Sequence, residues 1–300
     1  MRKKSILNSP RLLEIKKQKR QILKRKVLLV GIALLVLLVA LCFVVRIPKI
    51  NIHTVEVSGN KVIDTEVIES IVKEELEGSY LWLIPKTNFL FYPKGNIIRE
   101  LEDQYKRLTG IEIKVRGAQT LEVSVNERVG LYTWCGEDLP AEGVNFEDVK
   151  CYFMDAQGYI FDQAPYFSGD VYFKFFGPLG DGAKDMESSN FLESPAGHYF
   201  IPELFVRTVL LEDTLSQMGT RVMALYVKDK SEMEFYLESS GSIRNAPKII
   251  VNQDADFIKI AENLDAALAT EPLKTDFKQK YDSLLYIDLR FGNKVYFKFK

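Results

Sequence analysis

The sequence contains few of the side chains on which most metal and catalytic sites depend. Its 300 residues include two histidines, His53 and His198, and three cysteines, Cys42, Cys135 and Cys151. Neither histidine has another histidine or a cysteine at the short spacing of a zinc site. The phosphate-binding Walker A sequence and the glycine-rich dinucleotide fingerprint are also missing. We therefore expect no metal ion and no cofactor.

Candidate catalytic groups are present but lack the partners that their chemistry needs. Ser58 and Lys61 match the S-x-x-K motif of penicillin-binding proteins, but its companion sequences S-D-N and K-T-G do not occur. Two groups of carboxylates could be imagined as acid–base or metal pairs: Asp254 with Asp256, and Glu100 and Glu102 with Asp103. Each lies at the cap or on the polar face of an expected helix, which favours a solvated surface role. The sequence therefore predicts a protein that is not an enzyme.

Long apolar runs are also missing, with one exception at residues 27–45. These nineteen residues carry no charge, and at about 1.5 Å of rise per residue they would span roughly 28 Å, close to the hydrocarbon core of a bilayer. A cleaved signal peptide is the alternative, but the run is too long for a signal core and no small-x-small cleavage pattern follows it. We expect a single uncleaved transmembrane helix.

The charge distribution predicts the orientation of that helix. Residues 1–26 hold eleven lysines and arginines against one acidic residue, Glu14, so the positive-inside rule places this tail in the cytoplasm, against the anionic inner leaflet. The rest of the chain has 29 basic and 40 acidic residues. An acidic ectodomain argues against nucleic acid as a partner. We therefore expect a type II, single-pass protein of the plasma (inner) membrane.

The first part of the ectodomain, residues 50–128, reads as strand, helix, helix, strand, strand. A strand at 52–57 ends in the turn Ser58–Gly59–Asn60, and a helix follows Asp64. A second helix is expected at about 96–108, because apolar residues recur there at helical spacing, and Gly110 would end it. Alternating residues predict strands at 111–116 and 121–125. Two helices on one face of a three-stranded sheet would bury all these stripes, an α+β arrangement.

The second part, residues 129–300, reads as a β-rich domain with flanking helices. Strands are expected at 152–161, as a hairpin around the turn 155–158, and at 171–176, 222–227, 233–237, 248–251, 284–291 and 294–300. Helices are expected at about 202–218 and 255–269. Residues 177–197 are rich in Gly, Ser, Asp and Pro and read as a surface loop.

The two extracytoplasmic cysteines leave two possibilities open. Cys135 and Cys151 lie near the ends of two segments that would pair across a fifteen-residue loop. In an oxidising compartment they would form a disulfide, and for a loop of that length the entropic gain is about 3 kcal/mol. Two buried thiols are the alternative.

Several of these strings resemble a known family. Residues 50–128 resemble a POTRA domain in the order of their elements and in the strand-turn VEVSGN at 55–60. The closing string LEVSVNER at 121–128 resembles the junction that follows this domain in the bacterial cell-division proteins FtsQ and DivIB. The D-x-x-G turn at 155–158 and, most specifically, Tyr-Ile-Asp-Leu-Arg-Phe at 286–291 are similar to strings of the same family. A family string before the last helix begins at Gly241 but lacks its second glycine near Asn252.

The resemblance implies a scaffold at the division septum that helps to coordinate septal wall synthesis. Its partners would be the small bitopic division proteins FtsB (or DivIC) and FtsL, held by the β-domain. Because a terminal strand can accept another strand at its free edge, we expect the partner site along the last hairpin. The candidate residues are Tyr286, Asp288, Arg290, Phe291, Val295, Tyr296, Phe297 and Phe299. Two alternatives are a POTRA-bearing assembly or secretion factor and an anchored cell-wall enzyme or sensor.

Overall fold

The computed structural model describes residues 10–144, 149–167, 171–179, 194–228, 231–239 and 242–300, and the chain divides into two compact units. The first unit comprises residues 1–101 and 110–126, and the second comprises residues 102–109 and 127–300. Of the expected loop 177–197, residues 180–193 lie outside the described part of the chain.

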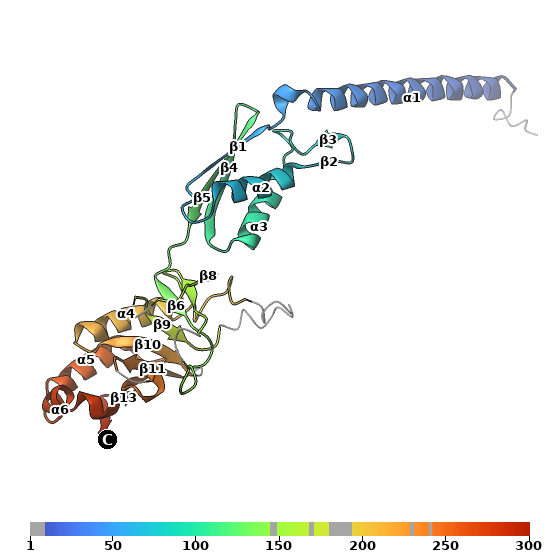
Figure 1. The fold of residues 1–300 in the computed structure, drawn as a ribbon. Coiled ribbons are helices and arrows are strands. Elements are labelled where there is room, and N and C mark those ends of the chain that lie inside the picture. Colours follow the sequence, from blue (N-terminus) through green and yellow to red (C-terminus); the bar gives the residue numbers. More distant parts are fainter. Residues whose placement is uncertain (1–9, 145–148, 168–170, 180–193, 229–230, 240–241) are drawn as a thin grey trace, which may run out of the picture. The chain divides into compact units, whose positions relative to one another are not determined.

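The first unit begins with the long helix α1, Pro10–Val45 (Figure 1). Within it, residues 19–45 are long and apolar enough to cross a membrane. An 18-residue apolar window of this segment has no buried residue, whereas Val45 at the end of the helix is buried. The helix also extends N-terminally into the basic tail. From Arg11 to Val30 the chain holds no glycine or proline and is rich in lysine, arginine, leucine and isoleucine, which are good or moderate helix formers.

The rest of the first unit is a small sheet with two helices (Figure 1). The elements follow in the order β1 (Thr54–Ser58), α2 (Thr65–Leu76), β2 (Ser79–Tyr80), β3 (Ile84–Pro85), α3 (Lys94–Gln104), β4 (Leu108–Arg116) and β5 (Thr120–Glu127). The strand order is β1-β5-β4, and β1 runs parallel to β5. The core between the helices and the sheet consists of fully buried apolar side chains. They are Ile68, Val72, Ile97 and Leu101 of the helices and Leu121 and Val123 of the sheet.

Gly59 closes the turn after β1 and is required there. Its φ of +91° is disfavoured for residues with a side chain, and a Cβ atom at this position would lie 2.0 Å from the carbonyl oxygen of Val125. The turn of the VEVSGN string therefore depends on a residue without a side chain.

The second expected helix is shorter than predicted. It ends at Gln104, the amide of Leu108 donates to the carbonyl of Tyr105 in a turn, and Leu108 opens strand β4. Gly110 lies inside β4 instead of ending the helix. The apolar spacing of Leu101, Tyr105 and Leu108 suits a helix, but pairing of β4 beside β5 in the sheet overrides it. The two-stranded hairpin β2–β3 was not expected.

The second unit is a nine-stranded mixed sheet in the order β14-β13-β12-β11-β10-β9-β6-β7-β8 (Figure 1). Its strands are β6 (Tyr132–Trp134), β7 (Tyr152–Met154), β8 (Ile160–Gln163), β9 (Lys174–Phe176), β10 (Val222–Val227), β11 (Glu232–Leu237), β12 (Lys248–Asn252), β13 (Leu284–Phe291) and β14 (Lys294–Phe299). Its helices are α4 (Phe205–Gln217), α5 (Phe257–Leu268) and α6 (Leu273–Gln279). Neighbouring strands are antiparallel except β6 with β9, β9 with β10, and β12 with β13, which are parallel.

The helices cover one face of this sheet and bury the main core. Phe205 and Leu215 of α4 and Leu264 of α5 pack with Phe235 of β11 and Ile287 of β13, and all five side chains are fully buried. The alternation of apolar and polar residues in β11, β12 and β13 thus places one set of side chains under the helices. The other set lies on the opposite face, which is called the outer face below.

The predicted strands of this unit are present with small shifts at their ends, and one helix was missed. Strand β9 covers only residues 174–176 of the expected 171–176. Helix α6 has seven residues, too short for its apolar residues Leu273 and Phe277 to establish a period.

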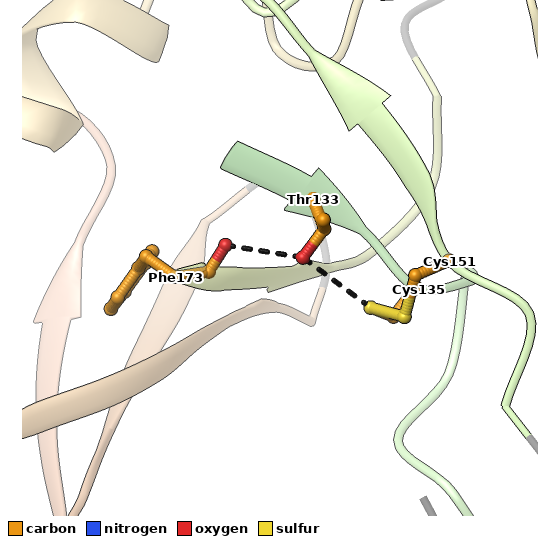
Figure 2. The surroundings of a disulfide bond; sticks show 4 residues. All are labelled: Thr133, Cys135, Cys151 and Phe173. Atoms are coloured by element: carbon orange, nitrogen blue, oxygen red, sulfur yellow. Dashed lines mark hydrogen bonds between the residues drawn. A yellow bond between two sulfur atoms is a disulfide. The ribbon is translucent and has the colours of Figure 1, made fainter. Parts of the chain in front are cut away.

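A disulfide joins Cys135, next to β6, to Cys151, next to β7 (Figure 2). The two strands pair antiparallel, with Trp134 opposite Tyr152, so the Cα atoms of the cysteines lie 4.1 Å apart. Thr133 stands beside the disulfide and donates a hydrogen bond from its hydroxyl to the carbonyl of Phe173, at 3.3 Å. Of the two possibilities open from the sequence, the structure contains the disulfide.

Candidate functional site: the free edge of the larger sheet

Strand β14 forms one edge of the nine-stranded sheet. It pairs with β13 alone among the described strands, so one row of its backbone groups has no neighbouring strand. The amide of Lys300 donates to the carbonyl of Ser283 at 2.8 Å, and Phe299 lies opposite Leu284. Because the direction of N–H groups alternates along an antiparallel strand, the amides and carbonyls of residues 295, 297 and 299 point away from β13.

The side chains of these three residues point into the protein. Val295, Phe297 and Phe299 are half-buried and pack against the main core under the helices. They therefore offer a partner their backbone groups rather than their side chains. Tyr296 lies on the opposite side of the strand from these three.

Two aromatic side chains stand exposed beside this edge. Phe291 has 56% of its surface accessible and Tyr296 has 49%. Their rings meet edge to face, with centroids 5.4 Å apart, and the guanidinium of Arg290 lies 5.7 Å from the Phe291 ring. Lys294, Lys298 and Lys300 are exposed along the same strand. The edge thus combines an apolar contact surface with charges that discourage indiscriminate strand pairing.

Asp288 and Arg290, two of the candidate partner-binding residues, bind each other. The Arg290 guanidinium donates from Nε to Asp288 Oδ1 at 2.9 Å and from Nη2 to Oδ2 at 2.6 Å, and Nη1 pairs with Glu232 of β11. Asp288 is buried. Burial alone would raise the pKa of the Asp288 carboxyl, but hydrogen bonds from the side chain and backbone of Arg290 hold that pKa below its usual value. The pair links two residues of β13 next to the exposed Phe291.

A second polar network lies on the outer face of the sheet, and it was not predicted from the sequence. Glu234 of β11 accepts hydrogen bonds from Lys248 of β12 at 2.7 Å and from the Tyr236 hydroxyl at 2.5 Å. Burial raises the pKa of Tyr236, and the neighbouring Glu234 carboxylate raises it further. Tyr286, half-buried, lies beside Lys248 on the neighbouring strand. The signal was present in β11, where charged Glu232 and Glu234 alternate with buried apolar residues.

The remaining candidates from the sequence belong to other elements. Ser58 ends β1, and its hydroxyl lies 3.2 Å from that of Ser124. Asp256 caps α5, where its carboxylate accepts from the amide of Ile258. His53 and His198 lie 3.0 and 3.2 Å from the carbonyls of Pro48 and Pro195. In the described part of the chain, no group of three or more His, Cys, Asp or Glu side chains is arranged to hold a metal ion.

The geometry thus defines a free strand edge beside an exposed aromatic pair, in a chain whose helix α1 carries an apolar stretch. In comparisons with known proteins, no family model matches the chain, and no curated protein matches the sequence.

Proposed function

We propose that this protein is a membrane-anchored scaffold of the bacterial division machinery that binds other division proteins through the free edge of β14. The single observation that carries the proposal is that edge, with three outward-facing amide and carbonyl groups next to exposed Phe291 and Tyr296. The partners would be FtsB- or DivIC-like and FtsL-like bitopic proteins. The protein would act at the septum, without enzymatic activity and without nucleic acid.

The fold of the first unit supports a family relationship. Its order of one strand, two helices and two strands, with β1 parallel to β5, agrees with a POTRA domain, and the hairpin β2–β3 would be an insertion between the helices. The second unit would then be the β-domain of FtsQ and DivIB, and Tyr286–Phe291 would lie on its penultimate strand. The apolar helix α1, at the start of the first unit, completes the same layout.

Strand addition suits the chemistry of the edge. A partner strand would satisfy the backbone groups of residues 295, 297 and 299, as neighbouring strands do elsewhere in the sheet. Its side chains on the outer face would contact Tyr296 and the nearby Phe291. Acidic residues in the partner would meet Lys294 and Lys298, which are exposed. The backbone would provide affinity, and the aromatic pair and lysines would select the partner.

The test is co-purification of the full-length chain, in detergent, with FtsB- or DivIC-like and FtsL-like proteins from the same organism. Truncating a buried aromatic anchor typically costs an interface about 2 kcal/mol, so we expect Phe291→Ala and Tyr296→Ala each to weaken binding about 30-fold. Ile258→Ala is a matched control, because Ile258 is 73% exposed on α5. Binding that both aromatic variants retain at full strength would contradict the proposed site.

Hydrogen exchange distinguishes strand addition from contact by side chains alone. The amides of residues 295, 297 and 299 should exchange slowly only when the partner is bound, whereas those of 296 and 298, which face β13, should be protected in both states. Unchanged exchange across residues 294–299 in a saturated complex would exclude β-augmentation. Peptidoglycan hydrolysis or transpeptidation that Ser58→Ala abolishes would overturn the scaffold itself in favour of a cell-wall enzyme.

A further inference from the structure

The tip of the β2–β3 hairpin presents large apolar side chains to solvent. Leu81 and Trp82 each have 87% of their surface accessible, and Tyr80 and Leu83 beside them have 40% and 42%. The value of 87% exceeds that of any other exposed large apolar residue among the described residues, including those of the membrane-spanning stretch. Packing within the protein therefore does not explain why the tip is apolar.

The backbone of the tip makes this choice of residues still more unusual. Leu81 and Trp82 have φ values of +46° and +66°, and the amide of Leu83 donates to the carbonyl of Tyr80 at 2.9 Å. Two consecutive residues with positive φ in a hairpin are normally glycine, asparagine or aspartate, because other side chains clash with the backbone there. The chain accepts this strain and still places leucine and tryptophan at the tip. Strained turns that persist point to a function of the residues they display.

The hairpin is fastened to the point where helix α1 ends. The guanidinium of Arg46, the first residue after the helix, donates to the carbonyl of Trp82 at 2.6 Å. The buried amide of Asn88 donates to the carbonyl of Val45 at 3.1 Å, and Asn51 donates to the same carbonyl at 3.2 Å. Figure 1 shows the β2–β3 hairpin beside the C-terminal end of α1. These bonds lie within one compact unit, so the tip and the helix end are held together.

We propose that Leu81, Trp82 and Leu83 insert into the lipid leaflet at the C-terminal end of α1. The inference rests on the proposed membrane anchor, because the hairpin can reach lipid only if α1 spans the bilayer and ends at Val45. The apolar tip is then continuous with the apolar surface of the helix. Tryptophan favours the membrane–water interface, and exposed Arg46 and Lys49 would lie at the level of the phosphates. Insertion would fix the first unit against the membrane surface.

Tryptophan fluorescence tests the insertion directly, because the chain has only two tryptophans, Trp82 and Trp134. The full-length protein is placed in nanodiscs of phosphatidylcholine, with or without bromine on the acyl chains. A Trp82→Phe variant measures the contribution of Trp134, which is buried in the second unit. By difference, we expect Trp82 to emit at short wavelength, to be shielded from aqueous acrylamide, and to lose most of its emission in the brominated discs.

A matched control places a tryptophan at an equally solvent-exposed site far from the helix end. Val62 is 65% exposed and follows β1, whose five residues carry the chain about 17 Å away from the exit of α1. Val62→Trp in the Trp82→Phe background should be quenched by acrylamide and not by bromine. If Trp82 were also quenched by acrylamide and not by bromine, the inference would be overturned. Shielding of Trp82 from both quenchers would overturn it as well, because that result would indicate a contact with protein. Extraction of the chain by alkaline carbonate would instead show that the anchor itself fails.

Discussion

At the scale of single residues, side chains of one sequence string have different roles. In the string 286–291, Asp288 and Arg290 bind each other inside the hairpin, whereas Phe291 at its end is exposed. A single short string therefore contains both residues that stabilise the fold and a residue that is exposed at the surface. Substitutions within the string should separate into effects on stability and effects on binding.

Arg290→Ala should destabilise the second unit. The change leaves the buried Asp288 carboxylate without its partner, and an unpaired buried charge costs about 2 kcal/mol or more. The folded-state pKa of Asp288 lies below its unfolded value, so the stability that the pair contributes is complete above the unfolded pKa, at about pH 4. It is lost as the pH falls through the folded pKa. The difference between wild type and variant should therefore be largest near neutral pH and shrink in acid.

Urea unfolding of the full-length protein at a series of pH values measures this difference. Arg221→Ala is the control, because Arg221 is 81% exposed at the side chain and its bridge to Glu238 lies on the surface. Exposed pairs contribute about 1 kcal/mol or less, so this variant should remain near wild type. A loss in Arg290→Ala no larger than that in Arg221→Ala would show that the Asp288 pair is not structurally important.

At the scale of elements, the short strands β6 and β7 are held by a covalent link. They pair through only three residues each, and the chain between them makes a long excursion that the disulfide closes. A hairpin of this kind gains little from its ladder alone. The disulfide therefore compensates for short strands near one end of the sheet.

Replacing Cys135 and Cys151 together by alanine should lower the free energy of unfolding of the second unit. The sequence separation of 16 corresponds, in the chain-entropy description, to a loss of about 3 kcal/mol. Denaturant unfolding of oxidised wild type, reduced wild type and the double variant provides the comparison. Cys42→Ala, which removes the free cysteine of α1, should leave unfolding unchanged. Equal midpoints for oxidised wild type and the double variant would contradict the expectation.

At the scale of the whole molecule, the helix α1 decides where both units act. Apart from Val45 at its end, its apolar stretch is not buried by the rest of the protein, so lipid is the environment that suits it. The basic tail at its start would keep the N-terminus cytoplasmic. Under the proposed function, residues 1–45 would determine the localisation, and the hairpin β13–β14 would select the partner.

Two arginines in the centre of α1 should weaken membrane anchoring. At about 3 kcal/mol for each arginine near the helix centre, Leu35→Arg with Leu38→Arg opposes insertion by about 6 kcal/mol. Part of the chain should then be released by alkaline carbonate, whereas wild type should remain in the membrane pellet. Val27→Arg with Val44→Arg is the matched control, because arginines at helix ends reach the interface. Equal retention of the central and terminal variants would argue against a bilayer-spanning α1.

What could be predicted from the sequence was local. The apolar run of α1, the strands β5 and β10 to β14, and the helices α2 and α5 each follow from a period that a few neighbouring residues establish. The lysines of β14 and the alternation of Val295, Tyr296 and Phe297 are local as well. Where two elements competed for the same apolar residues, as at Leu108, the period alone predicted the wrong end of a helix.

Only the tertiary structure decided which groups meet. Arg290 pairs with Glu232, 58 residues earlier, because β11 and β13 flank β12 in the sheet. Arg46 bonds Trp82, 36 residues later, because the hairpin folds back to the end of α1. Strand order leaves β14 at the free edge, with Phe291 and Tyr296 beside it. Such contacts depend on pairing between distant segments, which no local period encodes, whereas the membrane helix and the strand patterns require only their own residues.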